Sequence, residues 1–294
     1  MSVELLDGKK VAEELRTEIS EEVRELGHHN IVPALTMVRV GEDPASVVYM
    51  NAKAKLCDRV GVRSRIVSLP IDSSEERVRV VLQDINGDAA VHGAIVQLPL
   101  PEHLDPLKIL SLLSPDKDVD GFHPLNAGRL AIGKPLFVPA TPLGIHELLK
   151  RHGVSVAGAH VVIIGRSNIV GKPLANLLSI KSNDLNATVT LCHSASSNLE
   201  RIVRSADILV AAIGRAEFVT ASMVSPGTVV VDVGMNRVTD ASAKRGYRLV
   251  GDVKFDEVKE VASAITPVPG GVGPMTVAML LKNTVQACRV LGGI

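Results

Sequence analysis

Hydrophobic and polar positions follow two different periods along this chain. Segments with the spacing of amphipathic helices alternate with runs that are apolar at almost every position. We expect the apolar runs to be strands buried on both faces, which is typical of an α/β protein with mostly parallel sheets. The expected strands are residues 33–40, 93–99, 160–165, 187–192, 207–214 and 228–234.

The composition changes near the middle of the chain. Residues 115–145 are rich in Pro, Gly and Asp, as is common between two domains. We therefore expect two α/β lobes with a cleft between them, one formed by residues 1–140 and the other by residues 141–274. The last segment, about 275–294, has helical spacing after a Pro/Gly loop and is expected to pack back on the first lobe.

One helix of the first lobe is delimited at both ends. Asp43 can cap its amino end, Pro44 suits its first turn, and Gly61 can end it. An apolar row with a spacing of four residues is expected to face the sheet. This row consists of Val48, Ala52, Leu56 and Val60.

Tyr49 and Lys53 form the neighbouring row of the same helix, one turn apart, so both can face one ligand. A lysine at the margin of a buried face usually extends its ammonium group into water. A functional role needs a partner, and Gln97 is a candidate because it interrupts an apolar strand near its carboxyl end, where open α/β sheets bind ligands. In a partly apolar cleft the lysine pKa would fall toward neutrality, which suits proton transfer. Both interpretations are open at this point.

A second candidate site follows the strand at 160–165. The turn that opens with Gly165 and closes with Gly171 before a helix resembles the turn where a Rossmann domain binds a pyrophosphate. Ser167 occupies the place of the middle glycine, and the last glycine comes one residue late. The fingerprint is therefore imperfect but lies in the expected strand–turn–helix context.

The end of the following strand indicates which cofactor this turn would bind. The strand ends in CHS, without the acidic residue that binds the ribose 2′-hydroxyl of NAD. Arg166, together with the hydroxyls of Ser167 and Ser194, can instead accommodate a 2′-phosphate. The sequence therefore predicts NADP.

Two other patterns stop short of a functional motif. The segment from Gly165 to Lys172 imitates a P-loop, but it is one residue too long, and Pro173 stands where a Mg²⁺-binding hydroxyl is required. The segment DKDVDG at 116–121 matches the start of an EF-hand, but Ala127 occupies the position of the final glutamate. The histidines lack metal-ligand spacing, so no catalytic metal is expected.

Composition and charge exclude several classes of partner. The 294 residues carry 32 basic and 32 acidic side chains, so neither nucleic acid nor an anionic membrane surface is an expected partner. No apolar run approaches the roughly 20 residues that cross a bilayer, and the amino end lacks the pattern of a signal peptide. The 3 cysteines are far apart, which suits a reducing compartment. We expect a cytoplasmic protein.

Eight blocks of sequence together resemble the family of bifunctional methylenetetrahydrofolate dehydrogenase/methenyltetrahydrofolate cyclohydrolase, in the family's order and over nearly the full chain. The resemblance implies an enzyme of one-carbon metabolism that supports purine biosynthesis, with a Rossmann-like second domain and a homodimeric state. NADP would oxidise 5,10-methylenetetrahydrofolate to the 5,10-methenyl cation, and water would open that cation to 10-formyltetrahydrofolate. The blocks are YMNAKAKLC, VHGAIVQLPLP, KDVDGFHPLNAGRL, PATPLG, GRSNIVGKP, TVTLCHS, VVVDVGMNR and ITPVPGGVGPMTVAML.

The resemblance also implies roles for individual residues. Lys53 would assist the iminium chemistry and move protons around the attacking water, and Gln97 would position and tune it. Tyr49 would stack on the folate, and Asp120 would anchor the donor edge of the pteridine. Further substrate contacts would be Val96, Leu98, Pro269, Gly270, Gly271, Val272 and Gly273. The implied NADP contacts are Gly165, Arg166, Ser167, Ser194 and Met235.

Two other functions fit parts of the sequence. A two-lobed dehydrogenase of the shikimate type also uses a lysine in its cleft, but the blocks VQLPLP and PGGVGPMT argue against it. A regulatory protein that retains NADP without turnover would be expected to lack Lys53, Gln97 or Asp120, and all three residues are present.

Overall fold

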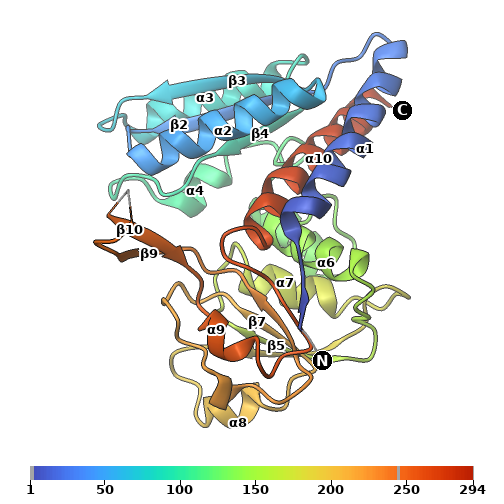
Figure 1. Cartoon of the computed structure of the whole chain (residues 1–294). Helices are drawn as coiled ribbons and strands as arrows, with labels where there is room; N and C mark the ends of the chain where they lie inside the picture. The colour runs from blue at the N-terminus through green and yellow to red at the C-terminus, as the bar shows by residue number, and fades with distance from the viewer. Residues whose placement is uncertain (1–2, 244–245, 294) are drawn as a thin grey trace. The chain divides into compact units, whose positions relative to one another are not determined.

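The computed structural model describes residues 3–243 and 246–293, and the chain divides into two compact units (Figure 1). The first unit comprises Glu13–Ala140 and Val277–Ile294, and the second comprises Met1–Ala12 and Thr141–Thr276. The first residues differ from the sequence-based boundary, because strand β1 (Glu4–Leu5) pairs in parallel with strand β11 (Ala264–Ile265) of the second unit.

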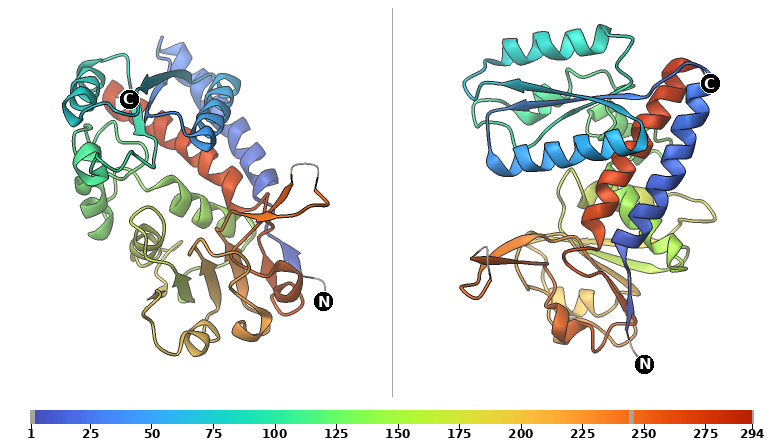
Figure 2. Two further views of the ribbon diagram at one scale, coloured as in Figure 1. Left: turned by 90° about the vertical axis from the view of Figure 1, so that its left-hand side faces the viewer. Right: turned by 45° about the horizontal axis from the view of Figure 1, so that its top comes forward.

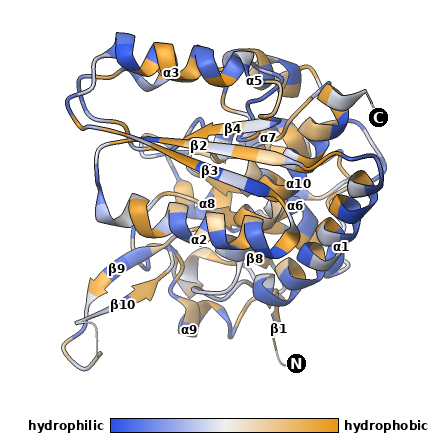
Figure 3. Ribbon diagram, turned by 90° about the horizontal axis from the view of Figure 1, so that it is seen from above, coloured by the Kyte–Doolittle hydropathy of each residue, from blue (hydrophilic) through white to orange (hydrophobic). Residues whose placement is uncertain are grey.

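The first unit contains a parallel three-stranded sheet in the order β3-β2-β4. Its strands are β2 (Ala34–Val40), β3 (Arg63–Leu69) and β4 (Gly93–Val96). The chain leaves β2 toward one neighbour and returns across the sheet to the other, so right-handed crossovers place the connecting helices on opposite faces. Figures 2 and 3 show this arrangement for α2 (Pro44–Val60) and α3 (Glu75–Gly87), with the mainly hydrophobic strands between them.

Four other helices contribute to the first unit. The short helices α4 (Pro106–Leu110) and α5 (Pro124–Ala131) follow β4. Most of the long helices α1 (Gly8–His28) and α10 (Val272–Gly292) also belongs to this unit, where Arg289 lies 3.1 Å from Glu22. The end of the chain therefore packs beside the segment that precedes β2.

The second unit contains a parallel six-stranded sheet in the order β1-β11-β8-β7-β5-β6. The chain moves from β5 (His160–Ile164) to β6 (Thr188–Cys192) on one side, and then to β7 (Ile208–Ala211) and β8 (Val229–Asp232) on the other. This reversal at β5 is the switch point where open α/β sheets bind ligands. The helices are α6 (Ala140–Arg151), α7 (Gly171–Leu178), α8 (Leu199–Val203), the 3₁₀ turn η1 (Ala221–Met223) and α9 (Phe255–Val258).

The predicted α/β class is confirmed, and each of the six expected strands is present, although all six are shorter than expected. Strand β4 ends at Val96 instead of residue 99, because Pro99 has no N–H to donate to a ladder. The sequence did not predict the edge strand β3 or the antiparallel hairpin of β9 (Asn236–Thr239) and β10 (Tyr247–Val250). These strands carry polar side chains at exposed positions, so they lack the continuous apolar pattern of the central strands.

Candidate active site and cofactor site

Helix α2 begins and ends at the predicted residues. The Asp43 carboxylate accepts a hydrogen bond from the Ser46 N–H at 2.7 Å, which satisfies a free donor of the first turn. Gly61 ends the helix with a φ of +84°, a conformation in which a side chain would be strained. The predicted sheet-facing row, however, is wrong except at Val60.

Of the four α2 residues predicted to face the sheet, only Val60 is buried. Val48 is 70% exposed and Ala52 is exposed, whereas Lys53 is only 6% exposed. The buried row repeats at the alternating three- and four-residue spacing of a helix that packs on a sheet. It consists of Met50, Lys53, Cys57 and Val60. Lys53 therefore lies on the buried face itself, and its ammonium group does not extend into water.

The Lys53 ammonium group has two neighbours inside the first unit. Its Nζ donates to Gln97 Oε1 at 3.2 Å and lies 4.7 Å from the centre of the Tyr49 ring. The Gln97 amide nitrogen donates to the Leu98 carbonyl at 2.7 Å, which turns the amide oxygen toward the lysine. The three side chains selected from the sequence therefore meet at the carboxyl end of β4 and on one face of α2.

Burial changes the acidity of this group. Desolvation lowers the pKa of Lys53 below its ordinary value, and the nearby Asp120 carboxylate partly opposes that change. Burial likewise raises the pKa of Asp120 to about 6, with Lys53 lowering it and Asp118 adding to the rise. The pKa values of an amine and of a carboxylate are thus both shifted toward neutral pH. Proton transfer near neutral pH requires such values.

The loop that carries Asp120 is held on the side of β4 and α3. The Ala94 N–H donates to the Lys117 carbonyl at 2.7 Å. The buried Lys117 ammonium donates to the carbonyls of Ile85 and Asp88, at 2.9 and 2.7 Å, at the end of α3. A lysine there satisfies helix carbonyls that have no partner within the helix.

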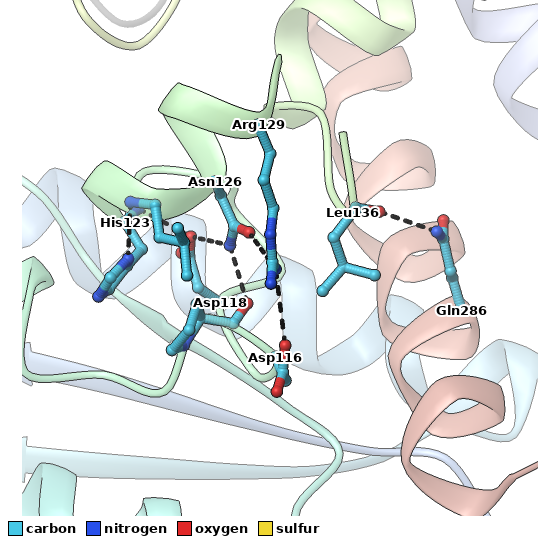
Figure 4. Close-up of polar contacts among 9 residues, drawn as sticks. Asp116, Asp118, His123, Asn126, Arg129, Leu136 and Gln286 are labelled. Atoms are coloured by element: carbon cyan, nitrogen blue, oxygen red, sulfur yellow. Dashed lines mark hydrogen bonds and ion pairs between the residues drawn. The ribbon is translucent and has the colours of Figure 1, made fainter. Parts of the chain in front are cut away.

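The same loop is tied to α5 by Asp118, one of the carboxylates that resemble an EF-hand (Figure 4). Its Oδ2 accepts from the His123 N–H at 2.8 Å and from the Asn126 side-chain amide at 2.9 Å. Asp116 instead lies 3.7 Å from Arg129. Asp118 and Asp116 thus have partners from this unit, and within residues 3–243 and 246–293 no group of three or more His, Cys, Asp or Glu side chains could hold a metal ion.

Helix α10 secures the loop from another side. The buried Asn283 amide donates to the carbonyls of Val119 and Val138, at 2.8 and 2.9 Å. Three residues later, the exposed Gln286 donates to the Leu136 carbonyl at 2.8 Å (Figure 4). Sequence reasoning missed these roles of Lys117, Asp118 and Asn283, because a polar side chain gives no indication of which distant donor or acceptor it meets.

We expect Asn283→Ala to destabilise the protein by about 2 kcal/mol or more, because two buried carbonyls would lose their donor. Urea unfolding followed by circular dichroism measures the change. Gln286→Ala is the matched control, since it removes a similar bond from an exposed site and should cost less than about 1 kcal/mol. If the two substitutions lowered the free energy of unfolding equally, burial would add nothing to the contribution of the Asn283 hydrogen bonds.

The turn after β5 has the close packing that its glycines predict. Gly165 has a φ of +122°, and a Cβ added to it would lie 2.1 Å from the Ala212 carbonyl oxygen. A Cβ on Gly171 would lie 2.0 Å from the Gly165 carbonyl oxygen. Ser167 Oγ accepts from the Val170 N–H at 3.1 Å just before α7 begins. The turn and the start of the helix can therefore receive a phosphate group at close range.

A pocket of about 370 Å³ in the first unit lies near β2 and β3, whereas a pocket of about 320 Å³ in the second unit lies at this turn. The pocket at this turn is lined by four of the residues that the sequence selected as cofactor contacts: Gly165, Arg166, Ser167 and Ser194. Seven further lining residues were not selected from the sequence. One ends β5, and the others follow the ends of β6 and β7: Ile164, His193, Leu199, Ala212, Ile213, Arg215 and Phe218.

Arg215 and Phe218 form a stacked pair in this wall, with the guanidinium carbon 4.5 Å from the ring centre. The pocket thus combines two arginines with apolar and hydroxyl side chains, which suits a nucleotide phosphate beside an aromatic base.

The remaining predicted contacts are placed as follows. Val96 is buried in the core of the first unit, and Leu98 is half-buried. Met235 is 56% exposed in the second unit, and a Cβ added to Gly273 would lie 3.4 Å from its methyl carbon.

The glycine-rich loop at 269–273 also belongs to the second unit. The Gly271 N–H donates to the Pro267 carbonyl at 2.8 Å, and the Lys9 N–H donates to the Gly270 carbonyl at 2.9 Å. A Cβ on Gly8 would lie 1.8 Å from the Gly271 carbonyl oxygen, so the loop packs directly on the start of α1. Within the described part of the chain, no helix is long and apolar enough to span a membrane.

Comparison with known proteins identifies the family of the chain. Models of the tetrahydrofolate dehydrogenase/cyclohydrolase catalytic domain and NAD(P)-binding domain match residues 6–120 and 139–291. The bifunctional protein FolD of Chlorobium chlorochromatii is 54% identical over 99% of this chain and 99% of its own length.

Two solved structures extend the likeness to the fold. The FolD dehydrogenase/cyclohydrolase of Campylobacter jejuni is 42% identical, with a TM-score of 0.93 over 98% of this chain and 99% of its own. The Trypanosoma brucei enzyme, solved with NADP and an inhibitor, is 40% identical, with a TM-score of 0.92 over 99% of this chain and 98% of its own. The chain therefore belongs to the tetrahydrofolate dehydrogenase/cyclohydrolase family, as its motifs predicted.

Proposed function

We propose that Lys53 is the proton-transfer group of a bifunctional folate enzyme, which oxidises 5,10-methylenetetrahydrofolate and hydrolyses the 5,10-methenyl product. The observation that supports this role most strongly is the 3.2 Å contact between its buried Nζ and Gln97 Oε1, beside the Tyr49 ring. A lysine with a lowered pKa can accept and return a proton near neutral pH, whereas an exposed lysine remains charged.

The two reactions place different demands on this group. In the first, a hydride leaves the methylene carbon for NADP, and the substrate becomes a methenyl cation. In the second, water adds to that cation, a proton is lost, and a carbon–nitrogen bond opens to give 10-formyltetrahydrofolate. Lys53 assists both steps by holding and moving protons, and Gln97 keeps its ammonium group aimed at the site.

Tyr49 and Asp120 hold the substrate in this proposal. The Tyr49 ring lies one helical turn from Lys53, so a folate ring stacked on it would lie within reach of the lysine. The Asp120 carboxylate accepts hydrogen bonds from the donor edge of the pteridine, as in the family pattern. Val96, Leu98 and the loop at 269–273 supply the other substrate contacts.

NADP is the cofactor, and its binding belongs to the second unit. Gly165 and the start of α7 receive the pyrophosphate, while Arg166, Ser167 and Ser194 receive the 2′-phosphate. Met235 adds a backbone contact. The cofactor supplies the hydride chemistry, and the protein supplies orientation and charge.

Arg166→Gln should weaken NADP binding by about 10- to 100-fold and leave the affinity for NAD within about threefold, because only NADP carries the 2′-phosphate. Isothermal titration calorimetry gives both dissociation constants. Arg201→Gln, on the exposed surface of α8 outside the pocket, is the control. An equal loss for both cofactors would place Arg166 at the pyrophosphate instead.

The ultraviolet spectrum of the wild-type enzyme tests the two activities together. With methylenetetrahydrofolate and NADP, absorbance of NADPH and of the methenyl product should rise. With the methenyl compound alone, absorbance should decay faster than in buffer. Absence of both changes would contradict the assigned function.

The proposal extends to the assembly and location of the enzyme. Family resemblance supports a homodimer joined through the second units, in the cytoplasm. Light scattering after size-exclusion chromatography should give twice the chain mass of 31.2 kDa. A single-chain mass at micromolar concentration would contradict the dimer.

A further inference from the structure

Two buried carboxylates of the second unit have no part in the functions given above. Asp232 ends strand β8 and is 3% exposed, and Asp252 follows strand β10 and is fully buried. Buried carboxylates are costly unless donors surround them. Both are indeed surrounded by donors, and these donors show what the carboxylates hold.

Asp252 binds the chain just after strand β7 and at the start of strand β9. Its Oδ2 accepts from the consecutive N–H groups of Ile213 and Gly214, at 2.7 and 2.9 Å, which follow β7. Its Oδ1 accepts from the side-chain amide of Asn236, the first residue of β9, at 2.9 Å. One carboxylate thus joins the loop after β7 to the start of β9, at the carboxyl edge of the sheet where the cofactor pocket lies.

Asp232 holds the backbone of Asp252 in place. Its Oδ1 accepts from the N–H groups of Gly234 and Asp252, both at 2.9 Å, and its Oδ2 accepts from the Val253 N–H at 2.9 Å. The two carboxylates therefore act in series, with Asp232 fixing Asp252 and Asp252 fixing the loops.

Each carboxylate packs against a glycine that leaves room for it. A Cβ added to Gly251 would lie 1.7 Å from Asp232 Oδ2, and a Cβ added to Gly234 would lie 2.4 Å from Asp252 Oδ1. No other residue type fits at either position without displacing the carboxylate.

The loop that Asp252 holds is also a wall of the cofactor pocket. Ala212, Ile213 and Arg215 line that pocket, and the Ala212 carbonyl is the group on which Gly165 packs. A shift of this loop would therefore move the wall bearing Arg215 and the support of the dinucleotide turn together. One bond of Asp252 ends on the pocket-lining Ile213, and a second ends on its neighbour Gly214.

We propose that Asp252 is a positioning residue for the NADP pocket, held in place by Asp232. It acts through the backbone of residues 213 and 214 and does not touch the cofactor. The proposal rests on the assignment of this pocket to NADP. An asparagine at position 252 keeps the shape of the side chain but replaces one acceptor oxygen by an NH₂ group, which would face N–H donors.

Measuring both activities distinguishes a positioning role of Asp252 from a general loss of stability. A positioning role affects NADP binding alone, whereas lost stability affects both activities. In Asp252→Asn, the dissociation constant and KM for NADP should rise at least about tenfold. Hydrolysis of the methenyl compound without cofactor should stay within about twofold of wild type, because Lys53 lies in the first unit. The control is Asp256→Asn, an exposed aspartate paired with Lys259 in the same unit, which should change neither quantity.

Asn236→Ala provides a second, milder variant, which removes one donor to Asp252 and should raise the NADP dissociation constant about threefold. Unchanged NADP affinity in folded Asp252→Asn would overturn the proposal, as would an equal loss of hydrolysis and NADP binding. If Asp252→Asn does not fold, unchanged affinity in Asn236→Ala would overturn it. A wild-type enzyme that binds no NADP would instead refute the assignment of the pocket.

Discussion

Replacing Lys53 by methionine should reduce the hydrolysis of 5,10-methenyltetrahydrofolate by at least about 100-fold, since a positioned acid–base group typically contributes that much or more. Methionine retains the apolar stem, so the buried face of α2 keeps its packing, but it cannot carry a proton. The decay of methenyl absorbance measures the effect. The affinity for NADP should remain near that of wild type, because the dinucleotide turn belongs to the other unit.

Lys55→Met is the matched control for this substitution. Lys55 is exposed on the same helix, two residues further along the chain, so its loss should leave both activities unchanged. Hydrolysis at the wild-type rate in Lys53→Met would show that another group moves the proton.

Asp120→Ala should raise the KM for folate in both reactions by about 10- to 100-fold, because the buried donor edge of the pteridine would lose its acceptor. Asp116→Ala is the control, since that carboxylate lies in the same loop but pairs with Arg129. Normal folate affinity in Asp120→Ala would show that this aspartate is structural.

The raised pKa of Asp120 gives the same residue a pH signature. Its carboxylate is ionised, and accepts hydrogen bonds well, above a pKa of about 6. Protonation removes that charge as the pH falls through this value. The kcat/KM for methylenetetrahydrofolate should therefore fall below about pH 6 in the wild type, and this acidic limb should be absent in Asp120→Ala.

The sequence predicted the α/β class, six of the strands and the ends of α2, because each depends on local pattern or capping. It misplaced the buried face of that helix. A search for apolar side chains selected the row that contains Val48 and Ala52, whereas the core-facing row includes a lysine. Hydrophobicity alone therefore concealed that Lys53 is buried.

The residues that hold the sites in place could not be predicted. Asn283 meets carbonyls about 145 and 164 positions away in the chain, and Asp252 meets N–H groups that follow other strands. Such contacts depend on the folded arrangement, and no local period reports them. Strands β1 and β11 were not predicted because each has only 2 residues, which is too short to show a period.

The most direct test of the central claim is the pKa of Lys53 itself. Nitrogen NMR of lysine-labelled enzyme, with Lys53→Met to assign the signal, measures the titration of its ammonium group. We expect this group to titrate below the ordinary value of 10.5, at the same pH at which the hydrolysis rate changes. Titration of Lys53 at 10.5, with hydrolysis independent of its charge, would contradict its role as the proton-transfer group.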